Sequence, residues 1–132
     1  MKTKTSRLNK LVIVIMINMA ALFSNNVFAQ NHYMRIAKVV IDSAQLETYK
    51  VALKEGMHAA VANEPGVLSL SAVYDKEHPT HVTVFEIYAN EDAYKLHIQT
   101  AHFKKYKDTV KDMVKSLELT DVLPIALESK MK

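Results

Sequence analysis

Three short stretches rich in β-branched and aromatic residues predict strands. The first runs from Tyr33 to Ile41, where Arg35 interrupts apolar neighbours. The second runs from Val67 to Tyr74 and the third from His81 to Tyr88, with a polar loop around Pro79 between them. Two such stretches joined by a short polar loop predict a hairpin.

A helical spacing separates the first of these stretches from the second. Asp42 or Ser43 is placed to cap a helix, and Gln45 is placed to reach back in a capping box. Pro65 and Gly66 end the helix, because proline cannot continue the hydrogen-bond ladder and glycine accepts the backbone angles of a tight turn. The apolar face recurs at three- and four-residue steps and consists of Leu46, Tyr49, Leu53, Met57, Ala60 and Val61.

A second helical region follows the hairpin. Asn90 is placed to cap it, with Glu91 and Asp92 in the first turn, where carboxylates complement the helix dipole. Thr100 lies where one helix could end and another begin. Alternation from Leu117 to Ile125 then predicts a fourth strand. The second apolar face consists of Phe103, Tyr106, Val110, Met113, Val114 and Leu117.

The predicted order is strand, helix, strand, strand, helix, strand, which is the order of an α+β, ferredoxin-like β-α-β-β-α-β antiparallel sheet. In the third strand both alternating sets are apolar, with Val82 and Val84 on one side and Phe85 and Ile87 on the other. Both faces of the sheet should therefore be covered. A chain of this length has helices for one face, so we expect a homodimer in which a second copy covers the other.

The N-terminal segment has the pattern of an export signal. Its first ten residues contain no acid and four basic residues, Lys2, Lys4, Arg7 and Lys10. The apolar run from Leu11 to Phe23 is shorter than the ~20 residues of a bilayer span, and Val27-Phe28-Ala29 has small residues at the positions that a signal peptidase reads. We expect residues 1–29 to be a signal peptide and residues 30–132 to be one periplasmic or secreted domain. An uncleaved membrane anchor is the alternative.

Composition narrows the classes of partner and chemistry. Of the 17 Lys and Arg residues, four lie in the expected signal, which leaves 13 against 14 Asp and Glu and a formal charge near −1. The remaining lysines are interleaved with acids, so we expect no nucleic-acid partner. The absence of cysteine excludes disulfides, thiol catalysis and zinc–thiolate sites.

The six histidines of the chain raise the question of a metal site. His97 and His102 are five residues apart, which puts them about 140° apart around a continuous helix. No Asp or Glu lies at chelating spacing beside them in the sequence. The spacing therefore predicts no metal site.

Two polar residues in apolar surroundings are candidates for chemistry. His97 lies one turn after Tyr94, on a helix face where small residues leave room for a pocket, or it makes a hydrogen bond across the helix break. Glu86 lies in an apolar strand, where a carboxylate has to be paired, protonated or at a solvent edge. It either takes part in chemistry or bonds to the opening of the helix at Asn90.

Three sequence pieces together resemble the antibiotic biosynthesis monooxygenase (ABM) family, whose small domains oxidise quinol-like aromatics without a metal or flavin. They are EPGVL at 64–68, FEIY at 85–88 and AYKLHIQTAHF at 93–103. The resemblance extends from about residue 35 to residue 124 and implies a dimeric α/β barrel. Tyr88 stands where many relatives have tryptophan, so a substrate known for such a relative is not carried over.

The resemblance implies a cofactor-independent monooxygenase that uses molecular oxygen to oxidise a quinol or a related small aromatic substrate. His97 is the expected base, Glu86 would orient a histidine or the substrate hydroxyl, and His102 is a further catalytic candidate that could instead brace the second helix. No cofactor or metal is expected. An isomerase of a small carbonyl compound and a non-catalytic periplasmic ligand-binding module are the alternatives. The expected pocket walls are Tyr88, Tyr94 and Phe103.

Overall fold

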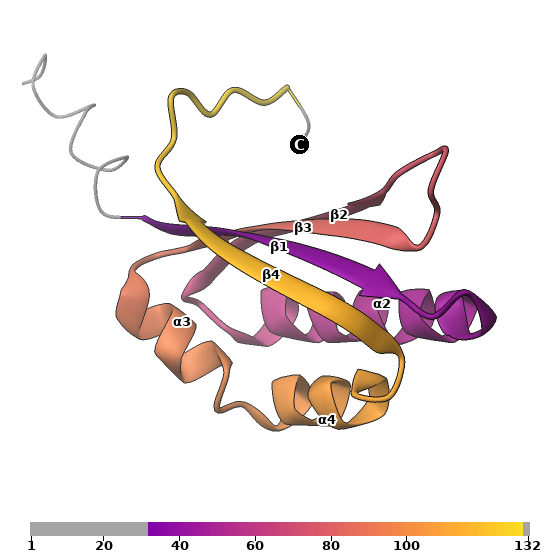
Figure 1. The fold of residues 1–132 in the computed structure, drawn as a ribbon. Coiled ribbons are helices and arrows are strands. Elements are labelled where there is room, and N and C mark those ends of the chain that lie inside the picture. The colour runs from indigo at the N-terminus through magenta and orange to yellow at the C-terminus, as the bar shows by residue number, and fades with distance from the viewer. Residues whose placement is uncertain (1–31, 131–132) are drawn as a thin grey trace, which may run out of the picture. The chain divides into compact units, whose positions relative to one another are not determined.

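The computed structural model describes residues 32–130, which form a four-stranded antiparallel sheet with helices on one face (Figure 1). The strands lie in the order β2-β3-β1-β4. They are β1 Tyr33–Ile41, β2 Val67–Tyr74, β3 His81–Tyr88 and β4 Val114–Val122. The helices are the short 3₁₀ turn η1 Ser43–Gln45, α2 Leu46–Asn63, α3 Glu91–His97 and α4 Ala101–Val110.

This arrangement confirms the predicted ferredoxin-like order, and β1, β2 and β3 have the predicted bounds. The helix break at Thr100 is also present: the Thr100 hydroxyl accepts a hydrogen bond from the Phe103 backbone N–H and donates one to the His97 carbonyl. Within residues 32–130, no helix is long and apolar enough to cross a bilayer. The expected signal peptide lies outside the described residues.

The predicted boundary between the last helix and the last strand is wrong. α4 ends at Val110 and β4 begins at Val114, whereas the helical spacing extended to Leu117. The Asp42 backbone N–H donates to the Met113 carbonyl at 2.8 Å, and Val114 pairs with Ile41 of β1. The apolar residues Met113 and Val114 follow Val110 at three- and four-residue steps, as in a helix, although they lie in a turn and at the start of a strand. Pairing with the distant strand β1 thus overrides the local periodicity.

The predicted capping box is also wrong. The Asp42 carboxylate accepts from the Ala44 backbone N–H at 2.9 Å, so it caps the short η1 turn. Gln45 makes no capping hydrogen bond at the start of α2, and its side-chain amide donates instead to the Asp112 carbonyl. The 3₁₀ turn separates the capping residue from α2, which leaves Gln45 free to brace the turn before β4.

The strand register sorts residues onto two faces. The helix-facing side of β1 and β3 carries Ala37, Val39, Ile41, Val82 and Val84, which pack with Tyr49, Val110 and Met113 into the main core. Arg35 and Glu86 are direct partners across the same two strands and lie on the same side. Two charged residues therefore face the space between the sheet and the helices, and they need partners there.

The opposite face of the sheet is covered by no helix of residues 32–130 (Figure 1). Ile36 and Phe85 pair across its centre and remain only half-buried. Beyond β4, Leu123 and Ile125 are 87% and 106% exposed. We propose that a second copy of the chain covers this face, since an apolar area of this kind is unusual on a soluble monomer.

Sedimentation at micromolar concentration tests this proposal, with twice the monomer mass as the expected result. Phe85→Lys should shift the protein to the monomer, because it places a charge in the apolar contact. Leu96→Lys is the matched control: Leu96 is 71% exposed on α3, on the helix-covered side of the sheet, and its substitution should leave the dimer intact. A monomeric wild-type protein would refute the proposal.

Candidate active site

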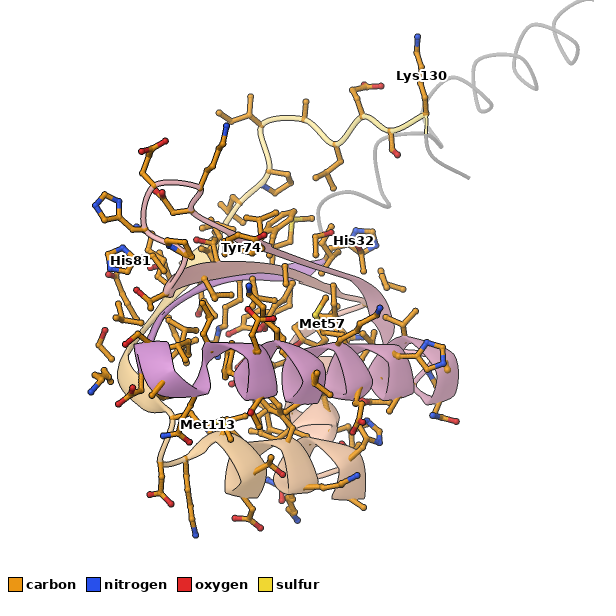
Figure 2. The ribbon with its side chains drawn as sticks, turned by 90° about the vertical axis from the view of Figure 1, so that its right-hand side faces the viewer. His32, Met57, Tyr74, His81, Met113 and Lys130 are labelled. Carbon is orange, nitrogen blue, oxygen red and sulfur yellow. The ribbon has the colours of Figure 1, made fainter. Side chains whose placement is uncertain are left out.

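A cavity of about 340 Å³ lies between the sheet and the helices. Side chains from all four strands and from α2, α3 and α4 line it, and most of them are apolar or aromatic. Figure 2 shows the side chains that fill the space between α2 and the sheet, with Met57 among those that line the cavity. The polar groups of the lining are therefore few and stand out: they include Arg35, Glu86 and His97.

The structure brings five of the six predicted site residues to this cavity. Tyr88, Tyr94 and Phe103 line it together with Glu86 and His97. His102 is not part of the lining and lies against Glu64 instead. The chemical roles assigned to these residues remain predictions. Their side chains meet in one cavity because of the way β3, α3 and α4 direct them.

Strand alternation in β3, the cap of α3 and the break before α4 bring these side chains together. Glu86 and Tyr88 are two residues apart in β3 and so share the helix-facing side. Asn90 caps α3 by accepting from the Ala93 backbone N–H at 2.9 Å. After the break that follows α3, α4 returns the Phe103 ring to the His97 ring, with 4.9 Å between their centroids.

Glu64 is a site residue that was not predicted from the sequence. It follows the last residue of α2, and its Oε1 lies 2.9 Å from His97 Nδ1 and in hydrogen-bond contact with His102 Nε2. The side chains are 12% exposed for Glu64, 9% for His97 and 24% for His102. In the sequence Glu64 only marked the end of a helix. Its place in the EPGVL piece of the resemblance was the one signal that pointed to it.

The hydrogen bond from His97 to Glu64 decides which ring nitrogen is free. A carboxylate only accepts, so with Glu64 ionised the Nδ1 of His97 carries the proton and donates. On a neutral ring Nε2 then has a lone pair. His97 lines the cavity and Glu64 does not, so we infer that Nε2, the ring nitrogen that Glu64 does not hold, is the one available to a molecule in the cavity. Glu64 can orient this base and stabilise its protonated form.

The break at Thr100 also changes the geometry on which the prediction of no metal site was based. The expected separation of about 140° assumed one helix over residues 97–102. The two imidazole rings instead lie 6.3 Å apart at their centroids, because α3 ends at His97. Ligand nitrogens of both rings and Glu64 Oε1 all lie within 4.8 Å of one another. Among residues 32–130, this is a group whose atoms could hold a metal ion.

Glu86 bonds to a neighbour in its own strand rather than to the helix opening at Asn90, which was the structural alternative. The Tyr88 hydroxyl donates to Glu86 Oε2 at 3.0 Å. Burial raises the pKa of the Glu86 carboxyl, and the Tyr88 hydrogen bond and the nearby His97 and Arg35 oppose this change. Burial, followed by the charge of Glu86, also raises the pKa of Tyr88. The cavity thus holds a carboxyl that keeps its proton more readily than a solvated one.

Arg35 fixes a second part of the cavity wall, around Tyr94. Its guanidinium donates to the Tyr94 hydroxyl and to Asp121 Oδ1, the latter at 2.8 Å, and lies 4.3 Å from the centre of the Tyr94 ring. The Tyr33 hydroxyl, followed by Arg35, lowers the pKa of Asp121 through hydrogen bonds. The hydrogen bonds of Arg35 are therefore shared among Tyr94, Tyr33 and Asp121. Arg35 was not among the site residues predicted from the sequence.

Comparison with known proteins places this geometry in a family. The sequence profile described as antibiotic biosynthesis monooxygenase matches residues 32–109. The crystal structure of a candidate monooxygenase of this family from Bacteroides thetaiotaomicron superposes on this chain with a TM-score of 0.75. The two sequences are 51% identical, and the match covers 79% of this chain and 99% of the other. A comparison with curated proteins gave no match.

More distant structures share the fold. A candidate monooxygenase from Lactobacillus acidophilus is 33% identical over 71% of this chain and 44% of its own, with a TM-score of 0.68. A candidate family member from Caulobacter crescentus is 24% identical over 75% of this chain and 96% of its own, with a TM-score of 0.65. The profile covers more than half of the chain. The chain therefore belongs to the antibiotic biosynthesis monooxygenase family and has the fold and the general monooxygenase-like character of that family.

Proposed function

We propose that the protein oxidises a quinol or a related small aromatic diol with molecular oxygen, without a bound cofactor. The observation that carries the proposal is the pairing of His97 with Glu64 at the wall of a cavity lined by aromatic rings. Such chemistry needs a base, an apolar space and groups that stabilise developing charge. Membership of the family supports the class of reaction, and the cavity supports the class of substrate.

In the proposed reaction His97 Nε2 accepts a phenolic proton from the substrate. Glu64 accepts a hydrogen bond from the other ring nitrogen and stabilises the imidazolium that forms. The electron-rich substrate anion is itself the reductant: one oxygen atom enters the product, and the other leaves as water with two hydrogens from the substrate. Glu86, when protonated, donates a hydrogen bond to a substrate oxygen and so orients the ring.

The size of the cavity limits the substrate. Its volume of about 340 Å³ is near the lower end of the ~300–1,000 Å³ that ligand cavities span. This favours one or two fused rings over a larger polycyclic molecule. The rings of Tyr88 and Tyr94 lie 5.4 Å apart in an edge-to-face arrangement and offer faces against which an aromatic substrate can pack.

We also propose that the protein acts outside the cytoplasm after cleavage following Ala29. The basic start, the short apolar run and the small residues before position 30 support this. The intact mass of the protein recovered from its native host measures it directly. A mass that includes residues 1–29 would refute both export by cleavage and the near-neutral charge of the mature domain.

His97→Ala should lower oxygen consumption with an aromatic diol by ~10²-fold or more, the usual contribution of a positioned general base. Glu64→Gln should lower it by ~10-fold or more, because the ring loses its orienting carboxylate. His81→Ala is the matched control, an exposed histidine on β3, and should leave turnover unchanged. An oxygen electrode with a panel of quinols, run on purified mature protein, measures all three.

The pattern of failure separates the alternatives. Full turnover in His97→Ala, together with loss in His102→Ala, would reverse the assignment of the two histidines. Turnover without incorporation of ¹⁸O from labelled oxygen would favour the isomerase. Binding of the diol without any turnover would favour the ligand-binding module.

Glu86 should make folding stability depend on pH. A solvated glutamate titrates near ~4.3, and the folded state holds the proton to higher pH. The protonated form therefore stabilises the fold fully below about pH 4.3, and this stability is lost as pH rises through the raised folded-state pKa. Glu86→Gln keeps an acceptor for the Tyr88 hydroxyl and has no charge to bury, so its Tm relative to wild type should rise with pH and then level off.

Thermal unfolding of both proteins between pH 4 and pH 8 measures this difference. Glu55→Gln, at an exposed position of α2 on the helix-covered side of the sheet, is the control and should give a difference that does not change with pH in this way. An equal Tm difference for Glu86→Gln at every pH would show that the Glu86 carboxyl has an ordinary pKa in the folded state.

A further inference from the structure

Glu64, His97 and His102, of which only His97 lines the cavity, form a set of possible metal ligands that the proposed reaction does not fully use. They come from different elements: Glu64 follows α2, His97 ends α3, and His102 lies in the first turn of α4. Their ligand atoms lie within 4.8 Å of one another. Two imidazoles and one carboxylate are the ligands that zinc and other first-row divalent metals take in sites with an open position. We infer that Glu64, His97 and His102 bind one such ion.

The dimensions fit an ion after a small adjustment. Zinc binds imidazole nitrogen and carboxylate oxygen at ~2.0–2.2 Å, so two ligand atoms of a tetrahedral site lie about 3.3 Å apart. Glu64 Oε1 and His97 Nδ1 are 2.9 Å apart, drawn together around a proton. An ion in place of that proton therefore requires these two atoms to lie about 0.4 Å farther apart. The His102 side chain is 24% exposed, so the group is in contact with solvent on that side.

The proton balance of this exchange is neutral. Without the ion and with Glu64 ionised, each neutral ring has to donate one N–H to the carboxylate, so Nδ1 of His97 and Nε2 of His102 carry protons. A metal ion needs the lone pairs of these two nitrogens. Each ring can supply its lone pair by moving its proton to the other nitrogen through solvent, so no net proton is released. Glu64 is already the anionic ligand that partly offsets the charge of the ion.

This tautomer change has a consequence that rests on the proposed function. When the ion holds Nδ1 of His97, the proton resides on Nε2, and the nitrogen facing the cavity becomes a donor. It can then no longer accept a phenolic proton. Metal binding therefore switches the proposed oxygenase off, and removal of the ion restores it.

A second group of similar composition provides the control. Asp75, His78 and His81 lie around the loop between β2 and β3, and the two rings stack with 5.5 Å between their centroids. His81 lies at the outer end of the hairpin (Figure 2), and all three side chains are exposed. Solvation and the mobility of exposed side chains make such a group a weaker ligand set than one already held together by packing and hydrogen bonds.

Titration of the metal-free mature protein with Zn²⁺ by calorimetry, and with Co²⁺ by visible absorption, tests the site without substrate. One ion per chain with a dissociation constant at or below the micromolar range is expected. His102→Ala and Glu64→Gln should each weaken binding by ~10-fold or more. The double variant His78→Ala, His81→Ala should bind as wild type does. Circular dichroism establishes that each variant is folded.

The outcomes separate the metal site from the proposed reaction. No binding by the folded wild-type protein overturns the site and leaves the oxygenase proposal untouched. Binding that survives His102→Ala but is lost in the double variant also overturns it, because the ion is then on the hairpin. In an active preparation, inhibition by Zn²⁺ that a chelator reverses supports the tautomer change, and unaltered turnover at full occupancy refutes it.

Discussion

The contact of Glu64 with His97 and His102 organises the functional half of the molecule. One carboxylate at the end of α2 accepts hydrogen bonds from side chains on α3 and α4, which the break at Thr100 separates. It thereby connects three helices beside the cavity. Glu64 and His97 are both largely shielded from water, and an unsatisfied buried polar group typically destabilises a fold by ~1–3 kcal/mol. The arrangement therefore has a structural as well as a chemical role.

The order of the elements and most of their bounds could be predicted from local pattern. β1, β2 and β3 are short, rich in β-branched residues and bounded by turn residues, so period and composition agree. The start of β4 could not be predicted in this way. Val114 continues a helical spacing along the chain, and only its pairing with Ile41 makes it a strand residue. Such pairing depends on residues more than seventy positions away.

The site divides along the same line. Glu86, Tyr88, Tyr94, His97 and Phe103 lie within one short region of the chain, and the family resemblance of that region, more than strand alternation or helical spacing, predicted that they share one space. Glu64 and Arg35 belong to the site through contacts that span 33 and 59 residues, with His97 and Tyr94 respectively. No spacing rule carries that information. The angle used to argue against a metal site is wrong for a related cause: a broken helix does not keep the angles of a continuous one.

The proposed chemistry depends on Glu64 holding His97 in the tautomer that leaves Nε2 free to act on a molecule in the cavity. ¹⁵N chemical shifts of the imidazole rings of metal-free protein measure this state directly, at a pH where the His97 ring is neutral. We expect a protonated Nδ1 and an unprotonated Nε2 for His97, with the preference lost in Glu64→Gln. A proton found on Nε2 in the wild-type protein would contradict this assignment, since the nitrogen facing the cavity could then accept nothing.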